Sequence, residues 1–395
     1  YRKYQEKETG RKAKKLPSTS PANAAFSIEK LTNEWKEICG PLQVAPAGIG
    51  GVLLNWYDYN ARILPWRSDP TPYHVWISEI MLQQTRVEAV KKYYDRFMKR
   101  IPDIHTLATI PEDELLKLWE GLGYYSRARN LKKAAQTIEE KYAGTFPNTY
   151  EEIITLSGIG EYTASAIASI CFGEKTSCVD GNVMRVISRI CHDKRNIDDA
   201  KTKKELKKEL EQIMPKEAGD FNEGLMELGE TICIPNGIPL CEECPLKNAC
   251  LSYQDQDYMN YPVRNEKKEK KELEYTVCIL KYKNLYWIEK RKQKGILQNL
   301  WQFPNMEGKY SKKELETKLK DKEFQVGKIT KQKTYTHIFT HQKWHMTSYV
   351  IELSEKPDCL TENENVSTWK SLEEVKRDYA IPTAFQPFLK ELENN

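Results

Sequence analysis

Apolar residues recur at helical spacing over much of the first two thirds of the chain. In the segment after Pro72 they are Ile80, Val87, Val90, Tyr94 and Phe97. Prolines at positions 102 and 111 interrupt this pattern, and stretches of helical pattern separated by turns continue to about Tyr253. The pattern predicts an all-α domain over residues 51–253.

The pattern changes after a highly charged stretch at residues 254–273. From Arg264 to Glu274 the chain alternates Lys and Glu with almost no apolar residue, so we expect a linker that buries no face. Short β-branched or aromatic runs then predict strands at Tyr275–Leu280, Leu285–Ile288 and Thr347–Leu353. Helical patterns follow at Lys312–Lys322 and Leu372–Tyr379. These elements predict a second, smaller α/β or α+β domain over residues 274–395.

Residues 1–50 show little periodicity of either kind. They carry a basic stretch and then continue through Pro, Ser and Ala, which is typical of a disordered extension. A solvated tail and a nuclear or organellar targeting signal both remain open. The acidic residues Glu6 and Glu8 are unusual for a transit peptide.

Length and composition restrict the class of protein. A chain of 395 residues is long enough for two domains, in agreement with the two patterns. No apolar run approaches the roughly 20 residues that a membrane-spanning helix needs, which excludes a membrane protein. The 61 Lys and Arg residues only slightly exceed the 57 Asp and Glu residues, so the net charge of +4 gives weak support for a polyanionic partner.

Four of the ten cysteines lie close together near the end of the helical region. Cys233, Cys241, Cys244 and Cys250 follow the spacing C-x7-C-x2-C-x5-C. Four thiolates in one short loop can bind either zinc or a four-iron four-sulfur (4Fe-4S) cluster. Zinc sites more often use two Cys-x2-Cys pairs, and only one pair is present, so we expect one 4Fe-4S cluster. Clustered thiols of this kind also favour a reducing compartment over secretion.

A glycine pair and an aspartate mark two further candidate positions. Gly158 and Gly160 separate two helical patterns, where backbone N–H groups could approach a phosphate or form a tight turn between helices. Asp180 directly precedes an apolar helical pattern. Its role could be an N-cap, or a carboxylate that the helix terminus keeps ionised with a low pKa.

A glutamate in an apolar helix supplies a second carboxylate. Glu79 lies in the segment Val75–Thr85, where almost every neighbour is apolar until the two glutamines. If Glu79 is buried, its pKa should be raised, and a protonated Glu with an ionised Asp is the pair used in glycosidic bond cleavage. Glu79 could equally be an exposed charge on a half-buried helix.

These positions occur within segments that closely resemble the MutY family of adenine DNA glycosylases, in the helix-hairpin-helix superfamily that includes endonuclease III. The resemblance runs from about residue 52 to 385. It rests on the hairpin with Asp180 and on the blocks Leu64–Arg67, Ser78–Thr85, Gly121–Asn130 and Phe221–Glu223.

The resemblance implies an enzyme of base excision repair that removes adenine mispaired with 8-oxoguanine or G in double-stranded DNA. By motif match, Glu79 would be the general acid and Asp180 the carboxylate that stabilises the sugar cation. Gln84 and Tyr124 would act near the stack vacated by the flipped base. The remaining matches are Asn182 and Glu223 in the adenine pocket and Arg67 on its rim.

One substitution predicts the reaction subtype. Relatives that also cut the DNA backbone carry a Lys just after the hairpin, where this chain has Tyr162. No Schiff base should form there, so the resemblance implies hydrolysis only, with Tyr162 near the reacting nucleotide. A monovalent cation at the hairpin is a further expectation.

The C-terminal region resembles the MutT-like domain of the same family, which has a Nudix-like fold. The Glu-rich metal box of Nudix hydrolases is missing between Gly308 and Gly327, which implies lesion recognition rather than hydrolysis. Phe339, Thr340 and His341 match the family loop that contacts 8-oxoguanine, where the family has Phe-Ser-His. An ordinary strand turn without a ligand is the alternative.

Two other classes of function compete with this interpretation. One is a thymine or uracil mismatch glycosylase of the same superfamily, which would not need the C-terminal domain. The other is a non-enzymatic iron-sulfur protein that binds DNA, which need not retain both carboxylates. For the enzyme we expect a monomer located in the bacterial cytoplasm, at the nucleoid, or in the nucleus or mitochondria of a eukaryote.

Overall fold

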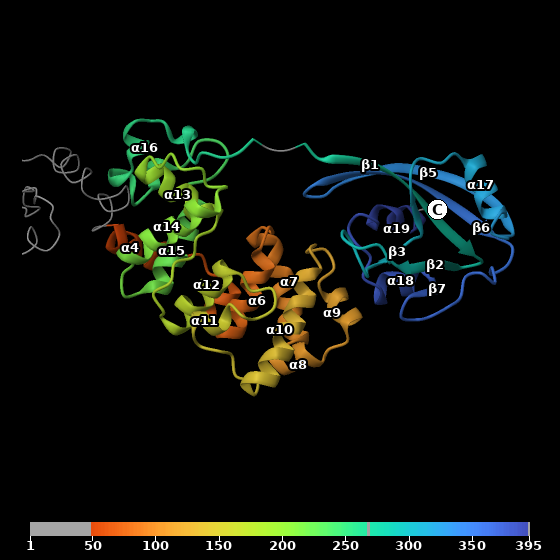
Figure 1. The fold of residues 1–395 in the computed structure, drawn as a ribbon, viewed down its shortest axis with the longest axis horizontal. Helices are drawn as coiled ribbons and strands as arrows, with labels where there is room; N and C mark the ends of the chain where they lie inside the picture. Colours follow the sequence, from red (N-terminus) through yellow and green to blue (C-terminus); the bar gives the residue numbers. More distant parts are fainter. Residues whose placement is uncertain (1–48, 267–268, 394–395) are drawn as a thin grey trace, which may run out of the picture. The chain divides into compact units, whose positions relative to one another are not determined.

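The computed structural model describes residues 49–266 and 269–393 (Figure 1). The extension expected at 1–50 lies almost wholly outside the described residues. By its contacts the chain divides into two compact units. Of the described residues, unit 1 contains 49–79 together with Phe146–Asn265, and unit 2 contains Ile80–Thr145 together with Glu266 and 269–393. The domain ranges expected from the sequence stay predictions.

Unit 1 is helical, as the apolar spacing predicts. Its longer helices are α4 (Ile49–Asn60), α6 (Pro72–Leu82), α12 (Glu161–Phe172), α13 (Gly181–Cys191), α14 (Ala200–Ile213) and α15 (Ala218–Thr231). Its short helical elements are α5 (Pro65–Ser68), α11 (Tyr150–Ile153), η1 (Cys241–Glu243), η2 (Lys247–Ala249), α16 (Leu251–Gln254) and η3 (Tyr258–Asn260). Helix α6 begins in unit 1 and its last three residues belong to unit 2.

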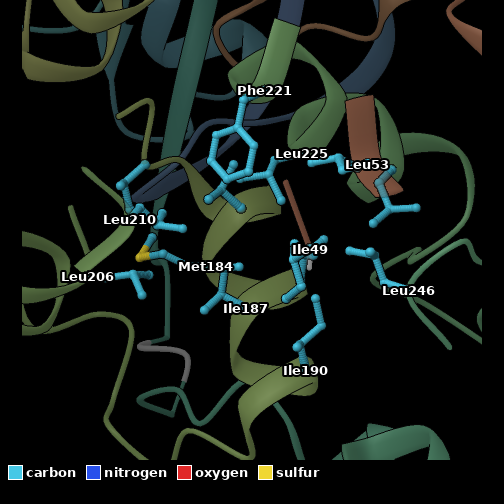
Figure 2. Close-up of a cluster of buried hydrophobic side chains, with 14 of the residues drawn as sticks. Ile49, Leu53, Met184, Ile187, Ile190, Leu206, Leu210, Phe221, Leu225 and Leu246 are labelled. Atoms are coloured by element: carbon cyan, nitrogen blue, oxygen red, sulfur yellow. The ribbon is translucent and has the colours of Figure 1, made fainter. Parts of the chain in front are cut away.

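The core of unit 1 forms where α4, α13, α14 and α15 present their apolar faces to one another. Figure 2 shows side chains from all four helices converging, with Leu53, Ile187, Leu210 and Phe221 among them. Cys233, Cys244 and Cys250 pack against the same core. The core therefore supports both the start of α13, where Asp180 lies, and the cysteine loop.

The first segment of unit 2 is also helical. It contains α7 (Val87–Arg100), α8 (Ile104–Thr109), α9 (Glu112–Leu118) and α10 (Ser126–Tyr142). Buried Phe97 and Trp119 meet edge to face, with ring centroids 6.0 Å apart. Between α9 and α10, Gly121 adopts a φ of 100°, and a Cβ there would lie 2.1 Å from the Tyr93 hydroxyl. Only glycine therefore fits at this turn.

The second segment of unit 2 holds a mixed sheet. Its strands are β1 (Lys271–Tyr282), β2 (Leu285–Lys290), β3 (Trp301–Gln302), β4 (Asn305–Glu307), β5 (Val326–Ile338), β6 (Gln342–Leu353) and β7 (Ser367–Ser371). The order is β3-β2-β1-β6-β5, with β4 paired to β1 and β7 to β2. Strands β1 and β6 are parallel, and the other pairs are antiparallel.

Helices cover both faces of this sheet, as the alternating side chains of β1 require. Val277 and Ile279 lie in one core with residues of α18 (Leu372–Asp378) and α19 (Gln386–Glu393). Cys278 and Leu280 lie in the other core, with residues of α17 (Lys312–Lys320). The predicted strands and helices of this region are confirmed, and the α/β fold class with them.

The segment 254–273, expected to be a charged linker, contains ordered packing at its start. Tyr261 is buried, and its ring stacks on His192 with centroids 5.0 Å apart. Strand β1 begins at Lys271. Among the residues that the structure describes, no helix is both long and apolar enough to cross a membrane.

Candidate active site

The glycine hairpin precedes helix α12. Gly158 adopts a φ of 77°, which permits the turn after α11, and Gly160 is the N-cap of α12. A Cβ at Gly160 would meet no atom within 4 Å, so the space at this position is open. Backbone N–H groups at the start of a helix attract anions, and the open space allows a phosphate to approach.

Glu79 is buried in helix α6, with only 7% of its surface exposed. Burial raises the pKa of Glu79 to about 7, although a hydrogen bond with Tyr162 acts in the opposite direction. The charges of Glu223 and Asp180 add to the increase. The prediction that apolar neighbours bury Glu79 and raise its pKa is confirmed, and the exposed alternative is wrong.

Tyr162 lies beside Glu79 on helix α12. Its hydroxyl is hydrogen-bonded to Glu79 and lies 2.8 Å from the sulfur of Met226. Burial raises the pKa of Tyr162 well above its usual value, so the phenol stays protonated and can donate to the carboxylate. Tyr162 thus places a phenol where Schiff-base chemistry would need an amine.

Asp180 is the N-cap of α13, as its position before the apolar pattern predicts. Its Oδ1 accepts a hydrogen bond from the backbone N–H of Val183 at 2.8 Å, and its Oδ2 accepts one from Nδ2 of Asn182 at 3.0 Å. Burial nevertheless raises the pKa of Asp180, although these N–H donors favour the charged form. The expectation of a low pKa is therefore wrong, because it considered the helix terminus without the burial.

Asn182 is held by an arginine that also contacts the cysteine loop. Nη2 of Arg185 donates to Oδ1 of Asn182 at 2.9 Å and to the Gly229 carbonyl at 2.8 Å. Its Nε donates to the Cys233 carbonyl at 2.8 Å. A Cβ at Gly229 would lie 2.7 Å from the Cβ of Asn182, so α15 can approach Asn182 only with glycine here.

A pocket of about 430 Å³ opens beside Glu79. Its charged or aromatic lining comprises Tyr57, Arg62, Trp66, Arg67, Asp220 and Glu223, besides Glu79 itself. The resemblance implies Asn182 and Glu223 in the adenine pocket and Arg67 on its rim, and of these Arg67 and Glu223 line this cavity. Asp180, Asn182 and Tyr162 are not among the residues that line it.

An ion-pair network holds Arg67 and Glu223. Nε of Arg67 donates to Glu223 at 2.9 Å, and its Nη1 donates to Glu227 at 3.0 Å. Glu227 also accepts two hydrogen bonds from the guanidinium of Arg62, at 2.5 and 2.9 Å. Burial opposes the charge of Glu227, but these arginines outweigh it and lower the pKa of the carboxyl. Tyr57 completes the group through a hydrogen bond to Glu223 and by lying under Arg67.

Sequence reasoning missed Arg62, Glu227, Tyr57 and Arg185. One signal was available, since Glu223 and Glu227 are four positions apart on helix α15, whose other residues include buried Phe221, Leu225 and Leu228. Two carboxylates on one turn of a largely buried helix indicate basic partners from elsewhere in the chain.

The four cysteines of the predicted cluster line one small cavity. It is also lined by Arg189 and Lys247, and Nη1 of Arg189 lies 3.3 Å from the sulfur of Cys233. Burial raises the pKa of Cys244 to about 12 and that of Cys250 to about 11. Within the described residues, no three or more His, Cys, Asp or Glu residues converge closely enough to hold a single metal ion.

Gln84 and Tyr124 belong to unit 2 and share an unusual backbone conformation. Both lie in the left-handed region, with φ of 57° and 45°. Residues other than glycine rarely adopt this conformation, and they often do so at functional sites. Tyr124 has 48% of its surface exposed, which excludes a place in the core.

The loop Phe339–His341 connects β5 and β6 in unit 2. Phe339 stacks edge to face on Trp344, with centroids 4.7 Å apart, while Thr340 and His341 are exposed. The Thr340 hydroxyl is hydrogen-bonded to the Tyr124 hydroxyl. Within unit 2 the structure therefore brings together two positions that the sequence associates with the DNA. The carboxylates, the pocket and the cysteines lie in unit 1.

Sequence comparisons assign families to the helical region and to the region of the sheet. Residues 77–216 match the HhH-GPD superfamily of base excision DNA repair proteins, and residues 275–391 match the NUDIX domain. The chain is 36% identical to the adenine DNA glycosylase of Buchnera aphidicola subsp. Schizaphis graminum, over 86% of this chain and 97% of that protein. It is 34% identical to the human adenine DNA glycosylase, over 65% of this chain and 57% of that protein.

Among solved structures, a thermostable thymine-DNA glycosylase is 30% identical with a TM-score of 0.47, over 54% of this chain and 97% of that one. The sequence identity to relatives that are matched over 97% of their own length shows the family. The chain belongs to the adenine DNA glycosylase family.

Proposed function

We propose that this protein hydrolyses the N-glycosidic bond of adenine mispaired with 8-oxoguanine or G in double-stranded DNA. The observation that carries the proposal is Glu79, a buried glutamate beside a pocket of about 430 Å³ with a pKa of about 7. A carboxyl with this pKa is partly protonated at neutral pH and can donate a proton to a leaving base. Membership of the adenine DNA glycosylase family supports adenine as that base.

Glu79 and Asp180 take complementary roles in the reaction. Adenine leaves poorly as an anion, so Glu79 donates a proton to N7 while the bond to C1′ breaks. Asp180 stabilises the positive charge that develops on the sugar, with both of its oxygens oriented by Val183 and Asn182. Water then adds to C1′. The Tyr162 phenol stays protonated, orients the Glu79 carboxyl through their hydrogen bond and supplies no amine.

The remaining pocket residues recognise the base. Glu223 can accept a hydrogen bond from the exocyclic amine of adenine, and Arg67 holds this carboxylate at 2.9 Å. Tyr57 and Trp66 contribute aromatic surface to the same pocket. Thymine has no exocyclic amine, so this lining favours adenine over the mismatch thymine alternative.

We further propose that Cys233, Cys241, Cys244 and Cys250 hold one 4Fe-4S cluster. The four thiols line a common cavity, and their spacing contains only one of the two Cys-x2-Cys pairs that zinc sites more often use. When bound, such a cluster fixes the cysteine loop and can exchange one electron. Arg185 and Arg189 hold the loop to helix α13, on which Asp180 is the N-cap.

Phe339, Thr340 and His341 are proposed to recognise 8-oxoguanine opposite the adenine. Thr340 and His341 are exposed at a loop that Phe339 anchors on Trp344. The Thr340 hydroxyl can donate to or accept from the edge of a damaged base. Region 312–320 forms a helix without the Nudix metal box, so hydrolysis of nucleotides is not proposed for this domain.

A gel assay under single-turnover conditions tests the proposal. The substrates are duplexes with A opposite 8-oxoguanine, A opposite G, A opposite C, and T opposite G. We expect cleavable abasic sites from the first two duplexes only, with 8-oxoguanine preferred. Release of thymine instead of adenine would refute the proposal in favour of the mismatch thymine alternative. Absence of any base release, with DNA still bound, would favour the non-enzymatic one.

A further inference from the structure

A single buried arginine joins the two loops that carry Gln84 and Tyr124. Arg127 lies in the first turn of α10, and 9% of its surface is exposed. Nη1 of Arg127 donates to the carbonyls of Ile80 and Gln83 at 2.6 and 2.8 Å. Its Nη2 donates to the carbonyls of Leu122 and Gly123 at 2.9 and 3.2 Å.

Two of these carbonyls directly precede the two residues in left-handed conformation. Gln83 is the residue before Gln84, and Gly123 is the residue before Tyr124. Ile80 lies in the last turn of α6, where carbonyls have no partner within the helix. A planar guanidinium with five donors in a fixed geometry can bond both loops at once, which an ammonium cannot do with the same precision.

Arg127 also contacts the side chain of Tyr124. Its guanidinium carbon lies 5.5 Å from the centroid of the Tyr124 ring and 5.4 Å from that of Trp119. Within the part of the chain that the structure describes, no carboxylate forms an ion pair with Arg127, and burial lowers its pKa to about 10. A buried cation without a carboxylate is costly, so backbone carbonyls and aromatic rings must account for its presence.

We propose that Arg127 is a positioning residue that holds Gln84 and Tyr124 as one two-part wedge for base extrusion. The inference rests on the proposed function, in which these two residues fill the stack that adenine leaves. The left-handed conformations at Gln84 and Tyr124 are unfavourable for residues with side chains. The carbonyl contacts on one side of each residue restrict the backbone to these conformations before DNA binds.

Base extrusion can be measured apart from bond cleavage. The probe is a duplex with 2-aminopurine next to the mispaired adenosine, which carries a 2′-fluorine to suppress cleavage. Loss of stacking raises the 2-aminopurine fluorescence. Arg127→Met keeps the length of the side chain and removes every donor, and we expect extrusion to be slower by at least about tenfold, since hydrogen bonds to charged groups are strong.

Arg129→Met is the matched control on the same helix. Its guanidinium contacts Glu112 at 2.8 Å and the Gln298 carbonyl at 3.1 Å instead of the two loops. Extrusion by this variant should stay within about twofold of wild type, because an exposed ion pair contributes little. An equal loss in both variants would overturn the proposal.

A double-mutant cycle separates positioning from general stability. In the background Gln84→Ala with Tyr124→Ala, Arg127→Met should change the extrusion rate by less than about twofold, because the residues it positions are absent. The full loss in this background would mean that Arg127 acts on the fold as a whole, which would overturn the proposal. Arg127→Lys keeps the positive charge and one hydrogen-bonding nitrogen. Its extrusion rate should lie between those of wild type and Arg127→Met.

Further measurements distinguish a loss of positioning from a loss of folding if Arg127→Met folds poorly. Thermal unfolding identifies such a failure, and the cycle is then run with Arg127→Lys. The pH dependence of adenine release should be unchanged in either variant, because Glu79 sets it. If wild type extrudes the base but releases no adenine from an unmodified duplex, the proposed function fails while the fluorescence test of Arg127 still stands.

Discussion

The hydroxyl of Tyr124 lies 2.6 Å from the hydroxyl of Thr340, which is 216 positions further along the chain. Tyr124 follows the Gly121 turn of the helical segment of unit 2, and Thr340 lies between strands β5 and β6 of the sheet. One hydrogen bond thus links a residue proposed to enter the DNA stack with a residue proposed to contact the lesion. The two would act on neighbouring parts of the same duplex.

Thr340→Val should reduce the preference for 8-oxoguanine over G. Valine has the shape of threonine without the hydroxyl, so both the bond to Tyr124 and any bond to the lesion are lost. One neutral hydrogen bond contributes about 0.5 to 1.5 kcal/mol, or about two- to twelvefold in the ratio of single-turnover rates. Thr340→Ser keeps the hydroxyl and should retain the preference. An unchanged ratio in Thr340→Val would contradict the role of Thr340.

The single-turnover rate of adenine release should fall as pH rises. Burial raises the pKa of Glu79 to about 7, and the protonated form is the active acid. The single-turnover rate should therefore be high below pH 7 and fall about tenfold per pH unit well above it. A rate that rises through this range would mean that Glu79 acts as a base. The measurement is a single-turnover pH profile with saturating enzyme.

The same pKa predicts a pH-dependent effect on stability. A raised carboxyl pKa means that the folded state favours the protonated form, and this stabilisation is lost as pH rises through about 7. Glu79→Gln removes the ionisation, so it should stabilise the protein at pH 8.5 by roughly 3 kcal/mol relative to its effect at pH 4. Urea unfolding at the two pH values checks this, and equal effects would contradict the buried, raised pKa.

Glu227→Gln should weaken adenine recognition and the fold together. The buried carboxylate accepts hydrogen bonds from Arg62 and Arg67, and removing one partner of a buried ion pair typically costs about 3 to 5 kcal/mol. Arg67 would lose one of the contacts that hold it against Glu223. Glu230→Gln is the control, since Glu230 is a more exposed partner of Arg62. Chemical unfolding and single-turnover rates should change far less in this control.

Purified protein should contain about four irons and four sulfides per chain. Cys241→Ser should lose the cluster, as seen by iron content and visible absorbance, because one of four ligands is removed. Cys359→Ser is the control, since Cys359 is exposed in the C-terminal segment. Stoichiometric zinc without iron in wild type prepared without oxygen would contradict the cluster.

Local sequence was sufficient for some parts of the site and insufficient for others. The burial of Glu79 follows from its apolar neighbours, and the N-cap role of Asp180 follows from the helical pattern after it. The raised pKa of Asp180 does not follow from the local pattern, because it depends on desolvation in the folded chain. Glu227 and Arg127 look like surface charges on their helices, and only contacts with partners 165 and 47 positions away reveal their burial.

The sheet illustrates the same limit. Strands with consecutive buried and mostly apolar residues, such as Tyr275–Leu280 in β1, are recognisable because both faces are buried. Strand β5 is not predicted, because most of its positions at the edge of the sheet are exposed and two register shifts interrupt the alternation that marks a strand. Its extended conformation is fixed by antiparallel pairing with β6 and not by its own sequence.

The most direct test of the account is the single-turnover rate of adenine release by Glu79→Gln on a duplex with A opposite 8-oxoguanine. Glutamine keeps the shape of the side chain but cannot deliver a proton, and general acid catalysis contributes about 10² to 10⁴ in rate. We predict a loss of at least this size, with binding to the same duplex nearly unchanged. A Glu79→Gln enzyme that releases adenine at the wild-type rate would contradict the assignment of Glu79 as the acid.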